Sequence, residues 1–295
     1  MLSRRCVVTR IAVAAGALAT GANTAGATSL SDPLAAAFAA LETQSGGSLG
    51  VAMFDTCTGA RLSFNGDRRF PLCSTVKLLI AGAVLARIDR GADRLDRRIQ
   101  FTDADLLAYA PVTRGRVGGN GMSLEELCEA AVTVSDNTAA NLLLDMIGGP
   151  SGLTAFARSI GDDVTRLDRA EPDLNEALPG DPRDTTSPAM MLANLHALVL
   201  GSSLAPTSQA KLATWLAGNT TGDARLRAGL PKTWRVGDKT GTGGYGTTND
   251  VGIFWPPERA PVLVAAYLTG SPASPAARDA KIAAVGRAIA AAVAE

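Results

Sequence analysis

Ser74 and Lys77 stand three residues apart, at the start of an apolar run that predicts a helix continuing to Arg90 and ending at Gly91. On a helix, residues i and i+3 share a face, so the hydroxyl and the amine can meet. A serine becomes a nucleophile only when a neighbour takes its proton, and a lysine in a dry site can lose enough basicity to help. The helix start adds backbone N–H groups that suit a developing oxyanion. The pattern predicts a nucleophilic serine; the alternative is a surface serine beside a solvated lysine.

A second polar group, Ser135-Asp136-Asn137, lies between a predicted helix ending near residue 133 and another over 138–146. All three residue types favour helix N-termini, so a capping cluster is one interpretation. The functional interpretation uses Ser135 as a proton relay to a leaving nitrogen and Asn137 as an amide that clamps the substrate. Asp136 is expected to tie loops together through hydrogen bonds to nearby backbone.

The third group, Lys239-Thr240-Gly241-Thr242, ends a predicted strand and precedes a glycine-rich turn at 243–246. A lysine that protects an edge strand is the alternative interpretation. As a binding strand, Lys239, Thr240 and Thr242 would supply a cation and hydroxyls for a substrate carboxylate. The backbone N–H of Thr242 would be a second oxyanion donor, and Gly241 would let a ligand lie against the backbone.

Ser-x-x-Lys, Ser-Asp-Asn and Lys-Thr-Gly in this order form the signature of class A β-lactamases and penicillin-binding proteins. The segment Glu171-x-x-Leu174-Asn175 resembles the Glu-x-x-Leu-Asn element of class A serine β-lactamases, and the resemblance covers essentially the whole mature chain. It implies that Ser74 attacks the lactam carbonyl, while Glu171, helped by Asn175, activates the water that releases the acyl group. A positioned base contributes about 10²–10⁴-fold to such a step. Whether Lys77 or Glu171 takes the serine proton stays open.

The same resemblance implies further roles. Tyr109 is similar to the aromatic wall of the substrate cleft, and Arg225 to an arginine that some members aim at the substrate carboxylate, with Arg278 as a competing candidate. Arg169 and Asp184 resemble the pair that closes the family's omega loop. An exposed pair contributes only ~0–1 kcal/mol, so we expect this one to fix the shape of the loop rather than to add global stability.

Three cysteines remain after the expected export signal is removed: Cys57, Cys73 and Cys128. An odd number in an exported protein leaves at least one free thiol, and spacing alone pairs none of them. Some relatives have disulfides at the positions of Cys73 and Cys128. The partner positions in this chain hold Gly243 and Ala81, so the resemblance implies that both of these bridges are missing.

Composition excludes several functions. Lys plus Arg and Asp plus Glu both total 28, which gives no net charge, and no basic stripe indicates nucleic-acid binding. The single histidine, His196, lies in an apolar helical run, and no Gly-x-Ser-x-Gly elbow supports a Ser-His-Asp hydrolase. With so few histidines and cysteines, a zinc site is not expected. The β-lactamase reaction that the resemblance implies needs no metal and no organic cofactor.

Residues 1–27 read as an export signal, because paired arginines precede an apolar stretch and a small-residue cleavage site. Twin-arginine export and ordinary secretion fit this pattern equally. No later segment has the roughly 20 apolar residues that span a bilayer. We therefore expect a periplasmic or secreted monomer with no stable membrane association.

Periodicity places strands at both ends of the chain and helices in the middle. Strands are predicted at 49–55, 61–64, 233–239, 249–255 and 262–269. Helices are predicted at 32–44, 74–90, 124–133, 138–146, 150–160, 188–200, 206–216 and 276–294. This order predicts an α/β fold of the α+β type, with an antiparallel sheet flanked by terminal helices and an inserted all-α domain. The expected domains are 28–68 with 216–295, and 69–215.

Two other functions share part of this pattern. A D-Ala-D-Ala carboxypeptidase or transpeptidase would need the serine, the lysine and the strand, but not Glu171 and Asn175. A drug sensor that is acylated and stops would need a membrane tether or a partner domain. If the chain is a β-lactamase, Thr242 and the lack of side chains at Gly243 and Gly244 favour cephalosporins.

Overall fold

The computed structural model describes residues 31–294, so the expected export signal at 1–27 lies outside the described residues. In the part that is described, no helix is both long and apolar enough to cross a bilayer.

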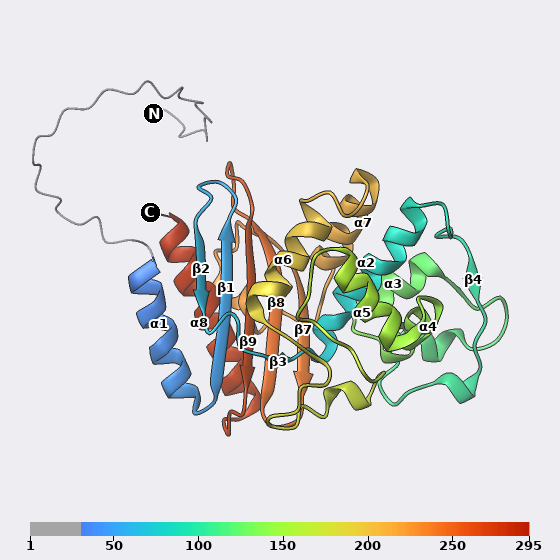
Figure 1. Ribbon diagram of the computed structural model, residues 1–295, viewed down its shortest axis with the longest axis horizontal. Coiled ribbons are helices and arrows are strands. Elements are labelled where there is room, and N and C mark those ends of the chain that lie inside the picture. Colours follow the sequence, from blue (N-terminus) through green and yellow to red (C-terminus); the bar gives the residue numbers. More distant parts are fainter. Residues whose placement is uncertain (1–30, 295) are drawn as a thin grey trace, which may run out of the picture.

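A five-stranded antiparallel sheet, in the order β2-β1-β9-β8-β7, forms the centre of the molecule (Figure 1). Its strands are β1 (Ser48–Asp55), β2 (Arg61–Phe64), β7 (Arg235–Gly243), β8 (Thr247–Trp255) and β9 (Val262–Thr269). β1 pairs along its whole length with β9, from Ser48 opposite Thr269 to Asp55 opposite Val262. The two ends of the chain therefore build one sheet, as the sequence predicts.

Helices cover both faces of this sheet, which explains why β9 is apolar from Val262 to Leu268. Val262, Val264, Ala266 and Leu268 belong to one hydrophobic core, whereas the intervening residues Leu263, Ala265 and Tyr267 belong to the other. Alternate side chains of a strand point to opposite faces, so both sets of β9 side chains from Val262 to Leu268 are buried in these cores.

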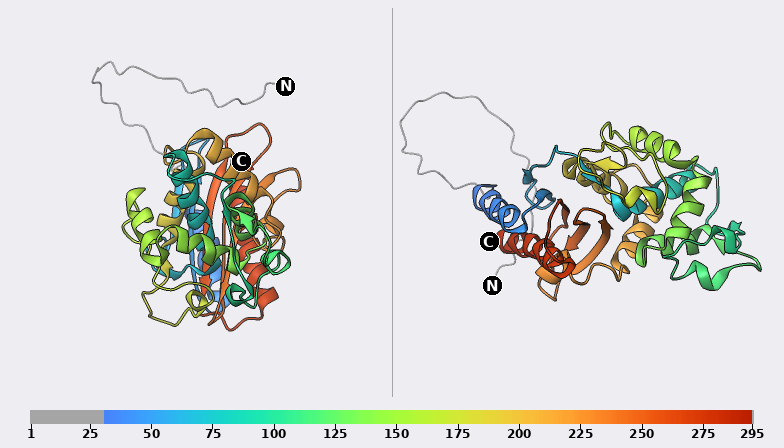
Figure 2. Two further views of the ribbon diagram at one scale, coloured as in Figure 1. Left: turned by 90° about the vertical axis from the view of Figure 1, so that its right-hand side faces the viewer. Right: turned by 90° about the horizontal axis from the view of Figure 1, so that it is seen from below.

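Helices α1 (Ser31–Ser45) and α8 (Pro275–Ala294) pack against each other and cover one face, as Figure 2 shows from below. The other face carries helices from the middle of the chain. These are α2 (Val76–Asp89), α3 (Leu124–Thr133), α4 (Asn137–Met146), α5 (Gly149–Ser159), α6 (Pro188–Val199) and α7 (Pro206–Ala217). All residues from Val76 to Ala86 are buried, which makes α2 the central helix of this group.

Two predicted boundaries are wrong at the residues that matter for chemistry. Ser74 does not begin the α-helix: it lies in a short 3₁₀ turn, Cys73–Thr75, because Cys73 has a φ of 45° that no α-helix accepts. β7 does not end at Lys239 to Thr242 but continues to Gly243, because residues 240–243 pair with residues 247–250 of β8.

The sequence also missed two small two-stranded sheets. One pairs β3 (Phe70–Pro71) with β6 (Thr185–Thr186), and the other pairs β4 (Arg98–Ile99) with β5 (Met122–Ser123). Two-residue strands carry no periodic pattern that a sequence could reveal. The β3–β6 pair matters for function because it joins the segment before Ser74 to the end of the loop that carries Glu171.

Candidate active site

Ser74 and Lys77 lie in contact where the 3₁₀ turn meets α2. The Lys77 Nζ atom donates a hydrogen bond of 2.9 Å to the Ser74 Oγ atom, and the Lys77 side chain is fully buried. Burial lowers the pKa of Lys77 because the charged form loses its hydration, while the nearby Glu171 carboxylate opposes this shift. The amine therefore loses its proton more readily than an exposed lysine does, and the deprotonated amine can accept the serine proton.

The backbone before Ser74 is strained and tightly packed. Cys73 has a φ of 45° without being a glycine, a conformation that costs about 1–3 kcal/mol and persists only where its surroundings enforce it. The neighbouring strand β7 packs tightly against this segment. A Cβ atom added at Gly241 would lie 2.9 Å from the Leu72 carbonyl oxygen and 3.2 Å from the Cys73 Cβ atom. Only a glycine at position 241 lets β7 pack this closely against the residues that flank Ser74.

Glu171 reaches Ser74 from the other side. Its Oε1 atom accepts a hydrogen bond of 3.1 Å from the Ser74 hydroxyl and lies 2.8 Å from the Lys77 Nζ atom. Its Oε2 atom accepts from the side-chain amide of Asn175. The backbone of Glu171 is held by Asn141, whose amide exchanges two hydrogen bonds of 2.9 and 3.0 Å with the Glu171 carbonyl and N–H. One carboxylate thus contacts both the nucleophile and its lysine.

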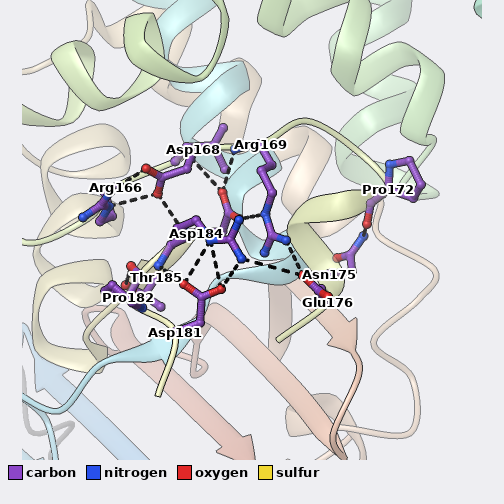
Figure 3. Close-up of polar contacts among 12 residues, drawn as sticks. Arg166, Asp168, Arg169, Pro172, Asn175, Glu176, Asp181, Pro182, Asp184 and Thr185 are labelled. Atoms are coloured by element: carbon purple, nitrogen blue, oxygen red, sulfur yellow. Dashed lines mark hydrogen bonds and ion pairs between the residues drawn. The ribbon is translucent and has the colours of Figure 1, made fainter. Parts of the chain in front are cut away.

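The loop that carries Glu171 is closed by Arg169 and Asp184 (Figure 3). The Arg169 Nε atom donates to Asp184 Oδ2 at 2.6 Å, and Asp184 Oδ1 accepts from the backbone N–H groups of Asp168 and Arg169 at 2.7 and 2.9 Å. Arg169 also bonds Glu176 at 2.5 Å. The Asp184 side chain is only 1% exposed, so the expectation of a weak surface pair is wrong: a buried partner is costly to lose.

Ser135 lies between the two buried lysines. Its Oγ atom accepts hydrogen bonds of 3.1 Å from both Lys77 and Lys239, which places one hydroxyl between two amines. The Asn137 side-chain oxygen accepts from Lys77 at 2.6 Å. Ser135 itself has a φ of 60°, a second strained residue in the same site.

Asp136 ties loops together, as predicted. Its carboxylate accepts hydrogen bonds from the backbone N–H groups of Val112 and Thr113, from the Thr113 hydroxyl, and from Ala139 in the first turn of α4. It therefore caps α4 and anchors the loop that carries Tyr109 at the same time.

Lys239 points from the edge strand β7 into the site and is fully buried. Burial and the positive charge of Lys77 lower the pKa of Lys239 to about 7. The next residue, Thr240, shares a 2.5 Å hydrogen bond with the hydroxyl of Thr221. A substrate carboxylate that enters the site would therefore meet an amine whose protonation changes near pH 7 and two hydroxyls that are hydrogen-bonded to each other.

Arg225, not Arg278, reaches the binding strand. The Arg225 guanidinium donates to the Thr242 hydroxyl at 2.6 Å and to the Gly241 carbonyl at 2.9 Å, and its Nε atom pairs with Asp279 at 2.8 Å. Arg278 instead donates to the Thr248 hydroxyl at 3.1 Å.

These side chains surround a cavity of about 330 Å³, large enough for a small organic substrate. Its lining comprises Ser74, Tyr109, Ser135, Asn137, Asn175, Thr221, Arg225, Thr240 and Thr242. Tyr109 stands at the mouth, half exposed, and its hydroxyl donates to the Val134 carbonyl at 3.2 Å. Arg278 does not contribute to this lining.

The structure brings together all the site residues that the sequence predicts, and it adds two. Asn141 follows Asn137 by one turn of α4, so the i, i+4 spacing could have indicated it. Thr221 lies in a polar loop after α7, and only the fold places it beside Thr240. His196 lies elsewhere, edge-on to the Phe54 ring at 5.4 Å, and takes no part in the cavity.

Two cysteines carry free thiols within residues 31–294, Cys73 and Cys128, and both are buried. Loss of hydration raises the pKa of each thiol well above its ordinary value, so neither is a nucleophile. Among the described residues, no cluster of three or more His, Cys, Asp or Glu side chains could hold a metal ion.

A serine in contact with a buried lysine on one side and a carboxylate on the other defines a serine hydrolase that works through an acyl-enzyme. The comparisons with known proteins give the family. A model of the β-lactamase enzyme family matches residues 33–293. The chain is 52% identical over 231 residues to β-lactamase CTX-M-8 of Citrobacter amalonaticus, covering 78% of this chain and 79% of that protein. β-Lactamase OXY-2 of Klebsiella oxytoca is 48% identical over 229 residues, with the same coverage.

A solved structure supports the same family. The class A β-lactamase reconstructed as the last common ancestor of Gram-negative bacteria is 62% identical, with a TM-score of 0.87, covering 88% of this chain and 99% of that chain. The chain belongs to the β-lactamase enzyme family. It is a class A serine β-lactamase, which hydrolyses β-lactams through an acyl-serine intermediate.

Proposed function

We propose that Ser74 is the nucleophile and that Glu171 activates the water that releases the product. The observation that carries this assignment is the set of contacts at one point: Ser74 Oγ lies 2.9 Å from Lys77 Nζ and 3.1 Å from Glu171 Oε1. A single hydroxyl with a proton acceptor on each side can lose its proton for attack. After acylation, the same carboxylate lies beside the new ester.

Acylation would combine nucleophilic attack, stabilisation of the oxyanion and protonation of the leaving nitrogen. The Ser74 oxygen attacks the lactam carbonyl as its proton passes to Lys77, or to Glu171 through a water; both routes remain in the proposal. The backbone N–H groups of Ser74 and Thr242 hold the oxyanion, where one donor is typically worth ~3–4 kcal/mol. Ser135, which bonds both lysines, then delivers a proton to the lactam nitrogen, so that the C–N bond breaks and the ring opens.

Deacylation would use the omega loop. Glu171, with Asn175 on its second oxygen, removes a proton from a water that attacks the ester carbonyl. The C–O bond to Ser74 breaks, and the proton returns to the serine oxygen. The position of Glu171 argues against a D-Ala-D-Ala peptidase or a drug sensor. Proteins of both kinds lack such a base and therefore stay acylated by β-lactams.

Lys239, Thr240 and Thr242 would bind the substrate carboxylate, with Gly241 allowing close approach. Arg225 contributes charge and orients the Thr242 hydroxyl through its 2.6 Å hydrogen bond. Asn137 would clamp the substrate amide, and Tyr109 would form the wall of the cleft. The lowered pKa of Lys239, about 7, means that a bound carboxylate would restore its positive charge.

We further propose that residues 28–68 with 216–295 form one domain and 69–215 the other, with the cleft between them. The protein would be exported through its N-terminal signal, by either route, and act as a periplasmic or secreted monomer on β-lactam antibiotics without cofactor or metal. Size-exclusion chromatography of the mature protein should give a single species near the monomer mass, and a dimer would remove that part of the proposal.

A chromogenic cephalosporin tests the function directly. The purified protein should perform many turnovers per molecule, and peptide mapping after a quenched reaction should place the acyl group on Ser74. Ser74→Ala should abolish both signals while retaining the fold. A single burst followed by arrest, or an adduct on any other residue, would contradict the proposal.

A further inference from the structure

A row of three residues crosses the central sheet next to the segment that precedes Ser74. The row runs over β7, β8 and β9, which lie side by side (Figure 1). Gly241 of β7 lies opposite Asn249 of β8, and Asn249 lies opposite Tyr267 of β9. Residues directly opposite each other in an antiparallel sheet point to the same face. All three therefore face the backbone that leads to the nucleophile.

Asn249 holds this segment through its side-chain amide. The Nδ2 atom donates to the Pro71 carbonyl oxygen at 2.8 Å and makes a longer contact of 3.4 Å with the Leu72 carbonyl oxygen. Gly241, on the neighbouring strand, leaves the necessary room, because a Cβ atom there would lie 2.9 Å from the same Leu72 oxygen. Asn249 is fully buried, so solvent does not compete for these contacts.

Tyr267 holds the other end of the same turn. Its hydroxyl lies 3.0 Å from the Thr75 hydroxyl, which itself donates to the Leu72 carbonyl at 2.6 Å. A threonine hydroxyl has a single proton, so Tyr267 is the donor in its contact with Thr75. Leu72 and Thr75 are thus both anchored, and Cys73 and Ser74 lie between them. The anchors hold the turn in which Cys73 has its strained φ of 45°.

Stability does not account for an amide at position 249. The Asn249 Oδ1 atom is buried and has no hydrogen-bond partner among residues 31–294. A buried acceptor left unpaired typically costs at least as much free energy as one hydrogen bond contributes. An apolar side chain of similar size would therefore suit the core equally well, but it could not bind the Pro71 carbonyl.

We propose that Asn249 and Tyr267 are positioning residues that set the distance between the two oxyanion donors. The first donor, the N–H of Ser74, belongs to the turn that these two side chains anchor. The second, the N–H of Thr242, follows Gly241 in the strand that pairs with β8 at Asn249. Asn249 thus contacts the first donor's segment through its side chain and the second donor's strand through its backbone. The inference rests on the oxyanion hole of the proposed function and adds the residues that fix its width.

The effect of this positioning falls on the transition state. Oxyanion donors act when they lie roughly 2.7–3.1 Å from the charged oxygen, which forms only as the serine attacks. A donor that moves out of this range weakens binding of the transition state more than binding of the intact substrate. Loss of the anchor should therefore lower the acylation rate constant and leave the initial complex almost unchanged.

Stopped-flow acylation with a chromogenic cephalosporin in excess separates these two quantities. Asn249→Leu removes the amide and retains the approximate size of the side chain. Its acylation rate constant should fall at least tenfold, while the dissociation constant of the noncovalent complex should change less than twofold. Phenylboronic acid, which forms a tetrahedral adduct with a nucleophilic serine, should bind at least tenfold more weakly. A merely structural role would reduce the amplitude of the reaction through the folded fraction, but not its rate constant.

Asn194→Leu is the matched control, because Asn194 is also buried, its amide donates to Asp162 at 2.6 Å, and neither residue lines the cavity. It should acylate and bind the boronic acid like wild type. A fall of less than tenfold in the rate constant or the boronic acid affinity of Asn249→Leu overturns the proposal, as does an equal fall in Asn194→Leu.

Tyr267→Phe, which removes only a hydroxyl, provides the same test should Asn249→Leu fail to fold. It should lower the acylation rate constant at least threefold, and a smaller change would overturn the proposal. Failure of the proposed function is distinguishable from either result, because the wild-type protein itself would then form no adduct on Ser74.

Discussion

Replacing Asp184 with asparagine should weaken both the fold and deacylation, because the substitution breaks one specific contact. In the native protein, Asp184 Oδ1 accepts from two backbone N–H groups, and the side-chain oxygen of asparagine could keep both bonds. The other oxygen, Oδ2, accepts from Arg169 Nε at 2.6 Å. Asparagine would place an N–H group there, opposite the arginine N–H. The ion pair becomes a contact between two donors.

The magnitude follows from burial. Removing one partner of a fully buried pair costs about 3–5 kcal/mol. Arg169 is 18% exposed on its side chain and keeps its bond to Glu176, so we expect a smaller loss, about 2–3 kcal/mol of unfolding free energy. Because the pair closes the loop that carries Glu171, the deacylation rate should fall at least tenfold, while acylation changes less.

Urea unfolding and single-turnover deacylation measure the two effects. Asp181→Asn is the matched control in the same loop, since its partner Arg183 is 44% exposed on its side chain, and the loss of stability should be much smaller than for Asp184→Asn. If Asp184→Asn lost no more stability than Asp181→Asn and released its acyl group at the wild-type rate, the reasoning about a buried loop closure would be refuted.

Three further predictions concern the cleft. Lys239 is charged below its pKa of about 7, so kcat/KM for carboxylate-bearing substrates should fall as pH rises through that value; Lys239→Arg should shift the fall to higher pH, and an unshifted profile would exclude Lys239 as its cause. Ser135→Ala should slow acylation about hundredfold in stopped-flow assays with little change in melting temperature, and wild-type acylation would remove the proton relay. Thr242→Ala should reduce kcat/KM more for cephalosporins than for penicillins, and an equal loss on both would remove the substrate preference.

Local spacing explains what the sequence could predict. Ser74 and Lys77 are three residues apart, so helical geometry alone brings them together. The alternation of β9 between two cores could also be anticipated, because an unbroken apolar strand needs two covered faces. The Ser-x-x-Glu spacing of Ser123 and Glu126 is typical of a capping box at a helix N-terminus, and the structure shows both of its reciprocal hydrogen bonds.

Contacts between distant segments explain what the sequence could not predict. Thr221 meets Thr240 only because α7 leads back to the edge of the sheet. The end of β7 was placed too early because its glycines have low strand propensity, although the pairing with β8 overrides that preference. The lowered pKa of Lys239 depends on its burial and on the positive charge of Lys77, which lies 162 positions earlier in the chain, and no local pattern reports either.

The most direct test of the central claim is the lifetime of the acyl-enzyme in Glu171→Gln, followed by intact-protein mass spectrometry after mixing with a penicillin. The account predicts that the mass increase persists, with deacylation slowed by about 10²–10⁴-fold, because no base remains to activate the water. Asp173→Asn, a neutralised exposed acid in the same loop, should lose its acyl group like wild type. If Glu171→Gln also returned to its unmodified mass at the wild-type rate, Glu171 would not be the deacylation base.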